Sequence, residues 1–325
     1  MELITVNNNI SNQVISEDDV TISQGNFIEA NTEQVTLSHL KRECIIPNYS
    51  DSESTIAHSE FIDATNEVVQ ANFFGAKILQ PNIRISHTIK GRVPSAIGKP
   101  VKELKPEEKT IYYQRCAFMI EVPTLTENVN KNRLSLSIGG VRALNQENLY
   151  SKRNLEKFKV FIGYKNLVCT NLCISTDGLN ADIRVSSVAE LKDKINELIQ
   201  QFDKERFLGN MERMSKFHLD ELQFAHTIGK MRMYQHLNKA EKVGKLSLLM
   251  NDNQIGSVVK NYYEDINFSR TKDRDINLWN FYNLMTDANK SSYIDSNLER
   301  NANAFEFTTG LANSMQDKTA NWFLN

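Results

Sequence analysis

The hydrophobic period of the chain changes once, and this change constrains the possible folds more than any other feature of the sequence. From residue 83 to residue 174, apolar residues such as Ile83 and Ile85 alternate with polar ones, which is the period of β-strands. After Gly178 the apolar residues recur at helical spacing, most clearly from Val188 to Phe202. Because strands and helices occupy separate parts of the chain, we predict an α+β protein with an antiparallel or mixed β-sheet core followed by a helical carboxyl-terminal region.

Composition divides the chain into three segments. Residues 1–57 are rich in Asn, Ser, Thr and acidic residues and show no sustained hydrophobic period, so we expect an acidic leader that is disordered or folds onto the body only in short pieces. Residues 58–178 contain one amphipathic helical pattern, from 60 to 74, followed by the strand patterns. Residues 179–325 contain the helical patterns, and we expect this region to pack on or beside the sheet.

Two local signals add detail to this division. Ser187 followed by Glu190 has the spacing of a capping box, which predicts a helix beginning directly after Ser187. Gly139 and Gly140 stand together inside a strand pattern, where glycine marks either a β-bulge or a close approach of another part of the molecule.

Targeting signals and disulfides are not expected. The first residues lack the basic and apolar regions of a secretory signal, and no window approaches the run of about 20 apolar residues that spans a bilayer. We expect Cys44, Cys116, Cys169 and Cys173 to be reduced, since a cytosolic domain of this size does not need disulfides. The sequence thus predicts a cytoplasmic protein with no membrane partner.

No catalytic or cofactor motif is complete in the sequence. The segment 91–99 places six residues between its glycines where a phosphate-binding loop has four, and Pro100 stands where a hydroxyl would hold magnesium. His218, His226 and His236 occur at spacings that do not place them on one helical face, so they do not predict a metal site. We therefore predict no cofactor and no metal, and leave open whether the chain is an enzyme.

The distribution of charge is the remaining functional signal. The net charge of −2 conceals an acidic start, because residues 1–63 carry eleven acidic and two basic residues and the remainder carries a net charge of +7. Two segments concentrate the positive charge: residues 129–170 have a net charge of +6, and residues 82–116 have +5. Aromatic residues are interleaved with these bases, as they are in sheets that bind nucleic acid.

Seven bases of the first segment are the candidates for contact with DNA or RNA: Arg133, Arg142, Lys152, Arg153, Lys157, Lys159 and Lys165. The alternative is a half-buried sheet whose outward face is basic and whose aromatic residues belong to the core.

Several stretches of the chain have a distinctive amino-acid sequence. These are 86–92 (SHTIKGR), 134–150 (LSLSIGGVRALNQENLY), 156–164 (EKFKVFIGY), 168–178 (VCTNLCISTDG) and 275–295 (DINLWNFYNLMTDANKSSYID). Through them the chain resembles an uncharacterised Bacteroidetes family of domains of unknown function, number 3871, over most of its length beyond residue 80. More distantly, VCTN at 168–171 and LWNFYN at 278–283 are similar to two signatures of the phage/plasmid-like protein family (domain of unknown function 932).

These resemblances imply a setting and supply no catalytic residue. Members of both families occur on phages, plasmids and conjugative elements, so the favoured hypothesis is a mobile-element protein that contacts DNA or RNA in replication, recombination or transfer. An interaction factor that acts on host proteins, and a homo-oligomer, stay open. So does an enzyme with a site assembled from dispersed polar residues: Asn145, Gln146, Glu147, Asn148, Asn171 and Asp177.

Overall fold

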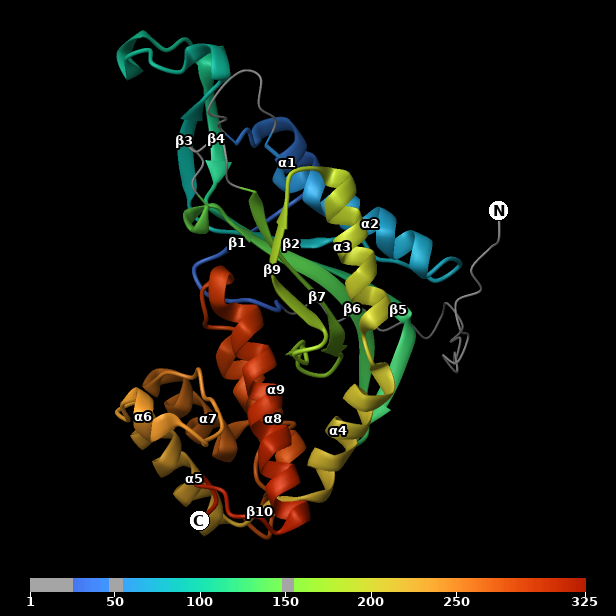
Figure 1. Cartoon of the computed structure of the whole chain (residues 1–325), viewed down its shortest axis with the longest axis vertical. Coiled ribbons are helices and arrows are strands. Elements are labelled where there is room, and N and C mark those ends of the chain that lie inside the picture. The colour runs from blue at the N-terminus through green and yellow to red at the C-terminus, as the bar shows by residue number, and fades with distance from the viewer. Residues whose placement is uncertain (1–25, 47–54, 148–154) are drawn as a thin grey trace.

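The computed structural model describes residues 26–46, 55–147 and 155–325, and it confirms the predicted α+β class. In these parts of the chain, seven strands form one antiparallel sheet in the order β1-β2-β5-β6-β7-β8, with β9 also paired to β7 (Figure 1). The strands are β1 (Glu33–Val35), β2 (Asn82–Ile85), β5 (Arg115–Val129), β6 (Asn132–Ala143), β7 (Glu156–Asn166), β8 (Leu172–Cys173) and β9 (Leu179–Val185). Of the two predicted sheet types, the antiparallel one is present.

The centre of the sheet is the long hairpin of β5 and β6. Val129 pairs with Asn132, so a two-residue turn joins the strands, and its residues Asn130 and Lys131 both have positive φ, at 44° and 67°. Two positive φ angles give a turn whose twist matches that of antiparallel strands. The tight turn therefore fixes the register that places side chains on one face of the sheet or the other.

Two helices cover one face of this sheet. α2 (His58–Asn72) and α3 (Val188–Gln201) lie side by side there, and Phe61 of α2 meets Phe118 and Phe158 with ring centroids 4.9 and 4.8 Å apart. Edge-to-face packing of this kind adds to the stabilisation that comes from burying the rings. The predicted amphipathic helix and the predicted helix after Ser187 thus both pack on the sheet.

The cap of α3 and the glycine pair of β6 have the roles that their sequence suggested. Ser187 accepts a hydrogen bond from the backbone N–H of Glu190 at 3.2 Å. Gly140 lies against α2: a Cβ atom added there would come within 2.4 Å of the Phe61 ring. The pair therefore marks a close approach, and the bulge between β5 and β6 lies elsewhere, between Val122 and Thr126 of β5.

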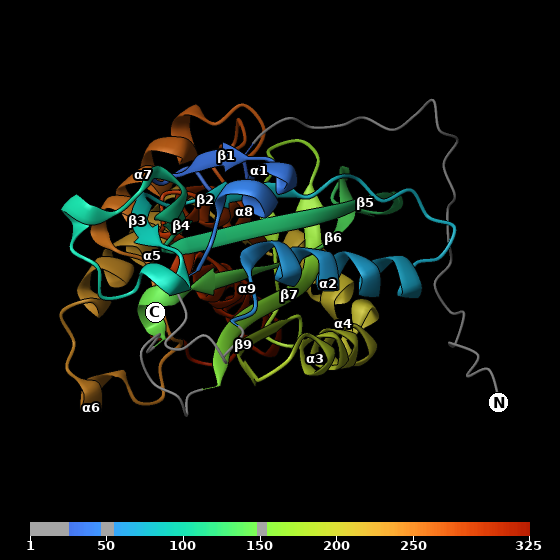
Figure 2. The same ribbon diagram turned by 90° about the horizontal axis from the view of Figure 1, so that it is seen from above.

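The other face of the sheet is covered by α9 (Ile294–Asp317), the longest described helix (Figures 1 and 2). Its Leu298 packs with Met119 and Phe161 of the sheet in a second buried cluster. Because both faces are covered, almost every side chain of β6 and β7 is enclosed, the polar ones included.

The helical region lies beyond one end of the sheet (Figure 1). Its remaining elements are α4 (Lys204–Lys216), β10 (His218–Leu219), α5 (Glu221–Tyr234), α6 (Lys239–Lys242), α7 (Asp252–Glu264), β11 (Ile276–Asn277) and α8 (Leu278–Asn289). Within the segment expected as a leader, β1 and the helix α1 (Leu37–Glu43) pack against the sheet and α2. Residues 1–25 and 47–54 of that segment lie outside the described residues.

The turn that contains residues 168–171 and the helix that contains residues 278–283 meet in the structure. Asn283 of α8 accepts a hydrogen bond from the Asn166 side chain at 3.1 Å, and its backbone carbonyl accepts one from the Asn171 side chain at 2.8 Å. Lys290 donates to the carbonyl of Cys169 at 2.7 Å. The turn after β7 is thereby tied to α8, and both asparagines of the turn are buried, so these stretches join the sheet to the helical region.

A second, two-stranded sheet stands away from the body of the molecule. It consists of β3 (Thr88–Arg92) and β4 (Lys109–Tyr113), joined by residues 93–108, and we call residues 88–113 the arm (Figure 1). The long connection contains three short 3₁₀ turns. At the base, the Tyr113 hydroxyl lies 2.6 Å from the Nε2 of His39 on α1, which anchors the arm to the body.

Candidate functional site

Three of the seven predicted contact bases are buried within the body. The guanidinium of Arg142 is fully enclosed and forms ion pairs with Glu147 and Glu156, and it also donates to the carbonyl of Ile56. Its carbon centre lies 4.8 Å from the centroid of the Phe158 ring. Such a cation is not available to a ligand, because separating it from its two carboxylates would leave buried charges without compensation.

Lys165 and Lys159 are enclosed on the face that α9 covers. Lys165 pairs with Glu121 at 2.8 Å, both side chains being less than a tenth exposed, and Ser135 donates to the same carboxylate at 2.7 Å. Lys159 pairs with Glu299 of α9. These lysines therefore bind the sheet together and hold it to α9, which explains why strands that are so well covered contain charged residues.

The other four predicted bases differ in position. Lys157 is partly exposed and pairs with Asp182 of β9 at 3.3 Å, and Arg133 is half-buried at the far end of β6. Lys152 and Arg153 lie outside the described residues. Among the five that the structure describes, Lys157 and Lys159 line one pocket, and the five do not form one basic surface.

The interleaved aromatic residues belong mainly to the core. Tyr113, Phe158, Phe161 and Tyr164 are buried, and Tyr112 is half-buried on the arm. Buried rings cannot stack on bases. The aromatic residues thus lie in the core, as in the alternative of a half-buried sheet with a basic outward face. The sheet itself differs from that alternative, because β6 and β7 are covered on both faces and Arg142, Lys159 and Lys165 are buried.

The bases of the second segment, in contrast, remain at the surface. Of the eight bases between residues 82 and 116, Arg84 and Arg115 belong to the body, and six lie on the arm with three acidic residues. Four of the six are exposed and have no ion-pair partner among the described residues: Lys90, Lys102, Lys105 and Lys109. Lys99 pairs with Glu108, and Arg92 donates to the carbonyl of Lys99, so these two stiffen the connection.

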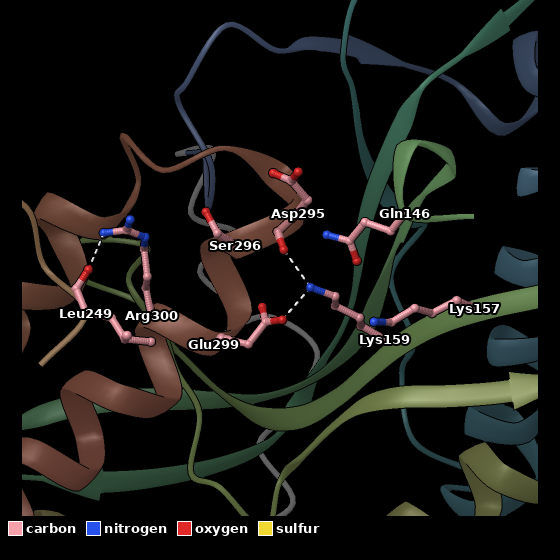
Figure 3. Close-up of a pocket in the computed structure, with 8 residues that line it drawn as sticks. All are labelled: Gln146, Lys157, Lys159, Leu249, Asp295, Ser296, Glu299 and Arg300. Atoms are coloured by element: carbon pink, nitrogen blue, oxygen red, sulfur yellow. Dashed lines mark hydrogen bonds and ion pairs between the residues drawn. The ribbon is translucent and has the colours of Figure 1, made fainter. Parts of the chain in front are cut away.

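A pocket of about 540 Å³ lies where β7 faces the first turns of α9 (Figure 3). It is lined by Gln146, Lys157, Lys159, Leu249, Asp295, Ser296, Glu299 and Arg300. The volume is within the range of roughly 300–1,000 Å³ that is usual for small-ligand sites. The lining combines three cations with two carboxylates and two neutral polar side chains, drawn from segments far apart in the sequence.

The dispersed polar set proposed for an enzyme is divided between separate places. Asn145 and Gln146 lie near the pocket, since Asn145 donates to Asp295 at 3.4 Å. Asn171 is buried against α8, and Asp177 pairs with Arg206 of α4 at 3.2 Å. Glu147 is the partner of Arg142, and Asn148 lies outside the described residues. The described members do not converge in one cleft.

The cysteines and the buried histidine have the environment of core residues. Burial raises the pKa of Cys116 and of Cys173 far above the usual value, which keeps both thiols protonated and unreactive. Burial, and then the nearby Arg142, lower the pKa of His58 to about 3, so this imidazole is neutral at physiological pH. Its Nε2 lies 2.9 Å from the carbonyl of Tyr113.

Within the residues that the structure covers, no group of three or more His, Cys, Asp or Glu side chains is placed to hold a metal ion. Nor does any helix in those residues combine the length and the apolar character needed to cross a membrane. The pocket and the arm are thus two features of the described surface that offer a ligand converging polar groups or unpaired charge.

The chain belongs to a family of unknown function. The family model described as "Domain of unknown function, B. Theta Gene description (DUF3871)" matches residues 8–324. The match extends over all the strands and helices named above, and over most of the segment expected as a leader. Comparison with curated proteins found no match, and comparison with solved structures found none.

Proposed function

We propose that this protein binds nucleic acid and that the arm is its principal contact surface. The observation that carries the proposal is the exposure of Lys90, Lys102, Lys105 and Lys109, which have no ion-pair partner in the part of the chain that the structure describes. They lie on a two-stranded ribbon that projects from the body and is tied to it where Ile111 meets Cys44 and Ile45 (Figure 1). A two-stranded ribbon has the width of the major groove of DNA, and unpaired lysines on it neutralise phosphates and release counterions.

The connection at the end of the arm supports duplex nucleic acid as the ligand. Ile97 and Val101 are exposed there, at 48% and 68% of their full surface. Apolar side chains at the end of a DNA-contacting segment can insert between base steps, which unstack at a cost of a few kcal/mol. Pro100 and Pro106 restrict the backbone beside them, so less conformational entropy is lost on binding.

We propose further that the protein acts in the cytoplasm, in the replication, recombination or transfer of a mobile element. This part of the proposal is supported by the resemblance of residues 168–171 and 278–283 to the phage/plasmid-like signatures. The arm itself is compatible with any process in which duplex nucleic acid is held.

The test is a binding titration of the full chain against single- and double-stranded DNA and RNA, followed by fluorescence anisotropy at several salt concentrations. We expect duplex binding whose logarithm falls linearly with the logarithm of the salt concentration. Reversing the four arm lysines to glutamate should weaken binding by at least about a hundredfold, because four phosphate contacts are lost. Each lost contact should also reduce the salt slope by about one unit.

The matched control reverses four exposed lysines of the helical region: Lys216, Lys239, Lys260 and Lys272. This variant has the same net charge as the arm variant and should retain most of the native affinity. If the two variants lose affinity equally, the arm is not the contact surface. If the native chain binds no nucleic acid at low salt, the proposed function is wrong.

A further inference from the structure

The pocket between β7 and α9 contains cations that its own carboxylates do not neutralise. Glu299 is the partner of Lys159, and Asp295 is held by Arg115 of β5 at 3.2 Å. Each carboxylate thus has a cation of the protein as its partner, although one oxygen of Glu299 is buried without a hydrogen bond. Lys157 and Arg300, on opposite sides of the pocket in Figure 3, remain to be accounted for.

Arg300 has no carboxylate partner among the described residues. Its Nη1 donates to the carbonyl of Leu249 and, at 2.6 Å, to the side-chain oxygen of Gln254, both of which are neutral acceptors. Burial lowers the pKa of Arg300, because this cation has lost part of its hydration and faces only neutral acceptors. An anion entering the pocket would provide the missing compensation.

Lys157 is available because its partner is weakly held. Asp182 lies 3.3 Å away on β9 and its side chain is 58% exposed. Exposed ion pairs are worth only about 0–1 kcal/mol, so a ligand anion can replace this carboxylate at little cost. Lys159 lies beside Lys157 on the same strand, and the amide of Gln146 faces Lys159 (Figure 3). Ser296 adds a hydroxyl on the side of α9.

We propose that this pocket binds the phosphate group of a phosphomonoester, with Lys157 and Arg300 as its cationic ligands and Gln146 and Ser296 as neutral donors. Phosphate suits this lining because lysine binds it as a point charge and arginine through several N–H donors at once. The inference goes beyond the arm, since none of the pocket residues belongs to it.

The phosphomonoester could be a free nucleotide or the end of a nucleic-acid strand. The second source is considered because the pocket lies close to the base of the arm. Gln114 directly follows β4, and its carbonyl accepts a hydrogen bond from the backbone N–H of Leu144 at 2.8 Å. Leu144 is two residues before Gln146 of the pocket. The experiment distinguishes the two sources.

The test is isothermal titration calorimetry of the full chain with inorganic phosphate, adenosine monophosphate and adenosine. We expect adenosine monophosphate to bind saturably with a dissociation constant below about 1 mM, and adenosine not to bind. Lys157→Gln and Arg300→Gln should each weaken binding of the monophosphate by about tenfold or more, as expected for one charge-assisted hydrogen bond to phosphate. Lys260→Gln, at an exposed lysine of α7, is the matched control and should bind as the native chain does.

A competition experiment identifies the source. A short oligonucleotide with a 5′-phosphate that displaces adenosine monophosphate, when the 5′-hydroxyl form does not, shows that strand ends enter the pocket; a lack of displacement shows that free nucleotides do. Thermal melting of Lys157→Gln checks that this surface variant remains folded. The proposal is overturned if neither phosphate nor the monophosphate binds saturably, or if folded Lys157→Gln binds like the native chain.

Failure of this proposal is separable from failure of the arm proposal. The variant with four reversed arm lysines should bind adenosine monophosphate normally. Conversely, Lys157→Gln should leave the salt dependence of binding to internal duplex sites unchanged. The two sites therefore have different readouts in the same protein.

Discussion

Residues 129–170 and residues 82–116 carry nearly the same excess of positive charge, +6 and +5, and the folded protein uses the two segments in opposite ways. In the first, Arg142, Lys159 and Lys165 lie in buried ion pairs between the layers. In the second, all five lysines lie on the arm and are exposed to solvent. A net positive charge along strands therefore indicates a surface for a ligand only where one face of the strands is exposed to solvent.

The difference follows from what covers each sheet. Helices lie on both faces of the central sheet, so almost every side chain of β6 and β7 is enclosed, and an enclosed cation requires an acid in a defined position. The arm is a two-stranded sheet that leaves the body, and solvent hydrates its lysines. The acids Glu121, Glu147 and Glu299, far apart in the sequence, are the partners of the cations of the central sheet; Glu121 and Glu147 are enclosed, and Glu299 is half-buried at the start of α9.

The largest effect on stability is expected when a buried cation of the first segment is removed. Arg142→Met leaves Glu147 and Glu156 without their cation, and we expect a loss of about 3–5 kcal/mol in the free energy of unfolding. Urea denaturation measures it. Lys109→Met on the arm is the paired control and should change stability by less than about 0.5 kcal/mol. Equal losses in the two variants would show that Arg142 is not a structural cation.

A smaller loss is expected where α2 touches the sheet. Gly140→Ala places a methyl group within 2.4 Å of the Phe61 ring and 2.6 Å of the Lys159 carbonyl, which forces the helix outward. Overpacking of this kind costs about 1–3 kcal/mol. Gly209→Ala, where an added Cβ meets no atom within 4 Å, should be stabilising or neutral in the same denaturation experiment. A native-like Gly140→Ala would mean that the layers are not in close contact.

The pH dependence of stability tests the enclosure of the body around Arg142. The pKa of His58 is about 3 in the folded chain and about 6.5 when unfolded, so between these values the unfolded chain binds the extra proton. This contribution to stability is complete above pH 6.5 and declines as the pH falls toward 3, by up to about 1.4 kcal/mol per pH unit. His58→Gln should reduce the slope between pH 6.5 and 5, measured from urea midpoints. An unchanged slope would contradict a buried, neutral His58.

The smallest effect on stability is expected from changes to the arm. An arm variant tests whether the exposed lysines of the second segment serve a ligand and not the fold. The variant with Lys90, Lys102, Lys105 and Lys109 reversed to glutamate should melt within a few degrees of the native chain, because exposed lysines without partners contribute little to folding. The same variant should lose nucleic-acid binding. A large drop in melting temperature would show that the lysines stabilise the arm or the body instead of contacting a ligand.

Some features were accessible from the sequence because they depend on neighbours in the chain. The alternation of apolar residues marked the strands, the helical stripe from 188 to 202 marked α3, and Ser187 with Glu190 marked its start. The helix α4, at 204–216, was not predicted, although Phe207, Met211 and Met214 form its buried stripe. Its polar composition conceals a stripe only three residues long, and the apolar period alone was too weak to reveal it.

The candidate site could not be predicted in the same way. The five described members of the seven candidate bases lie on β6 and β7, because the sequence shows charge and alternation but not which face a second layer will cover. The lysines of the arm belonged to the second basic segment, and one signal for them was present: strand patterns separated by a connection with Pro94, Pro100 and Pro106, longer than a packed hairpin needs.

By itself, the sequence determined the class of the fold, the strand-rich region 83–174, the helices near 60–74 and 188–202, and the family, since these follow from local periodicity and from the order of residues along the chain. The tertiary structure decided which positive charges are free. Lys159 and Lys90 are the same residue in strands of similar pattern, but one faces Glu299 beneath α9 and the other faces water. That outcome depends on contacts between residues more than a hundred positions apart, and no local pattern encodes them.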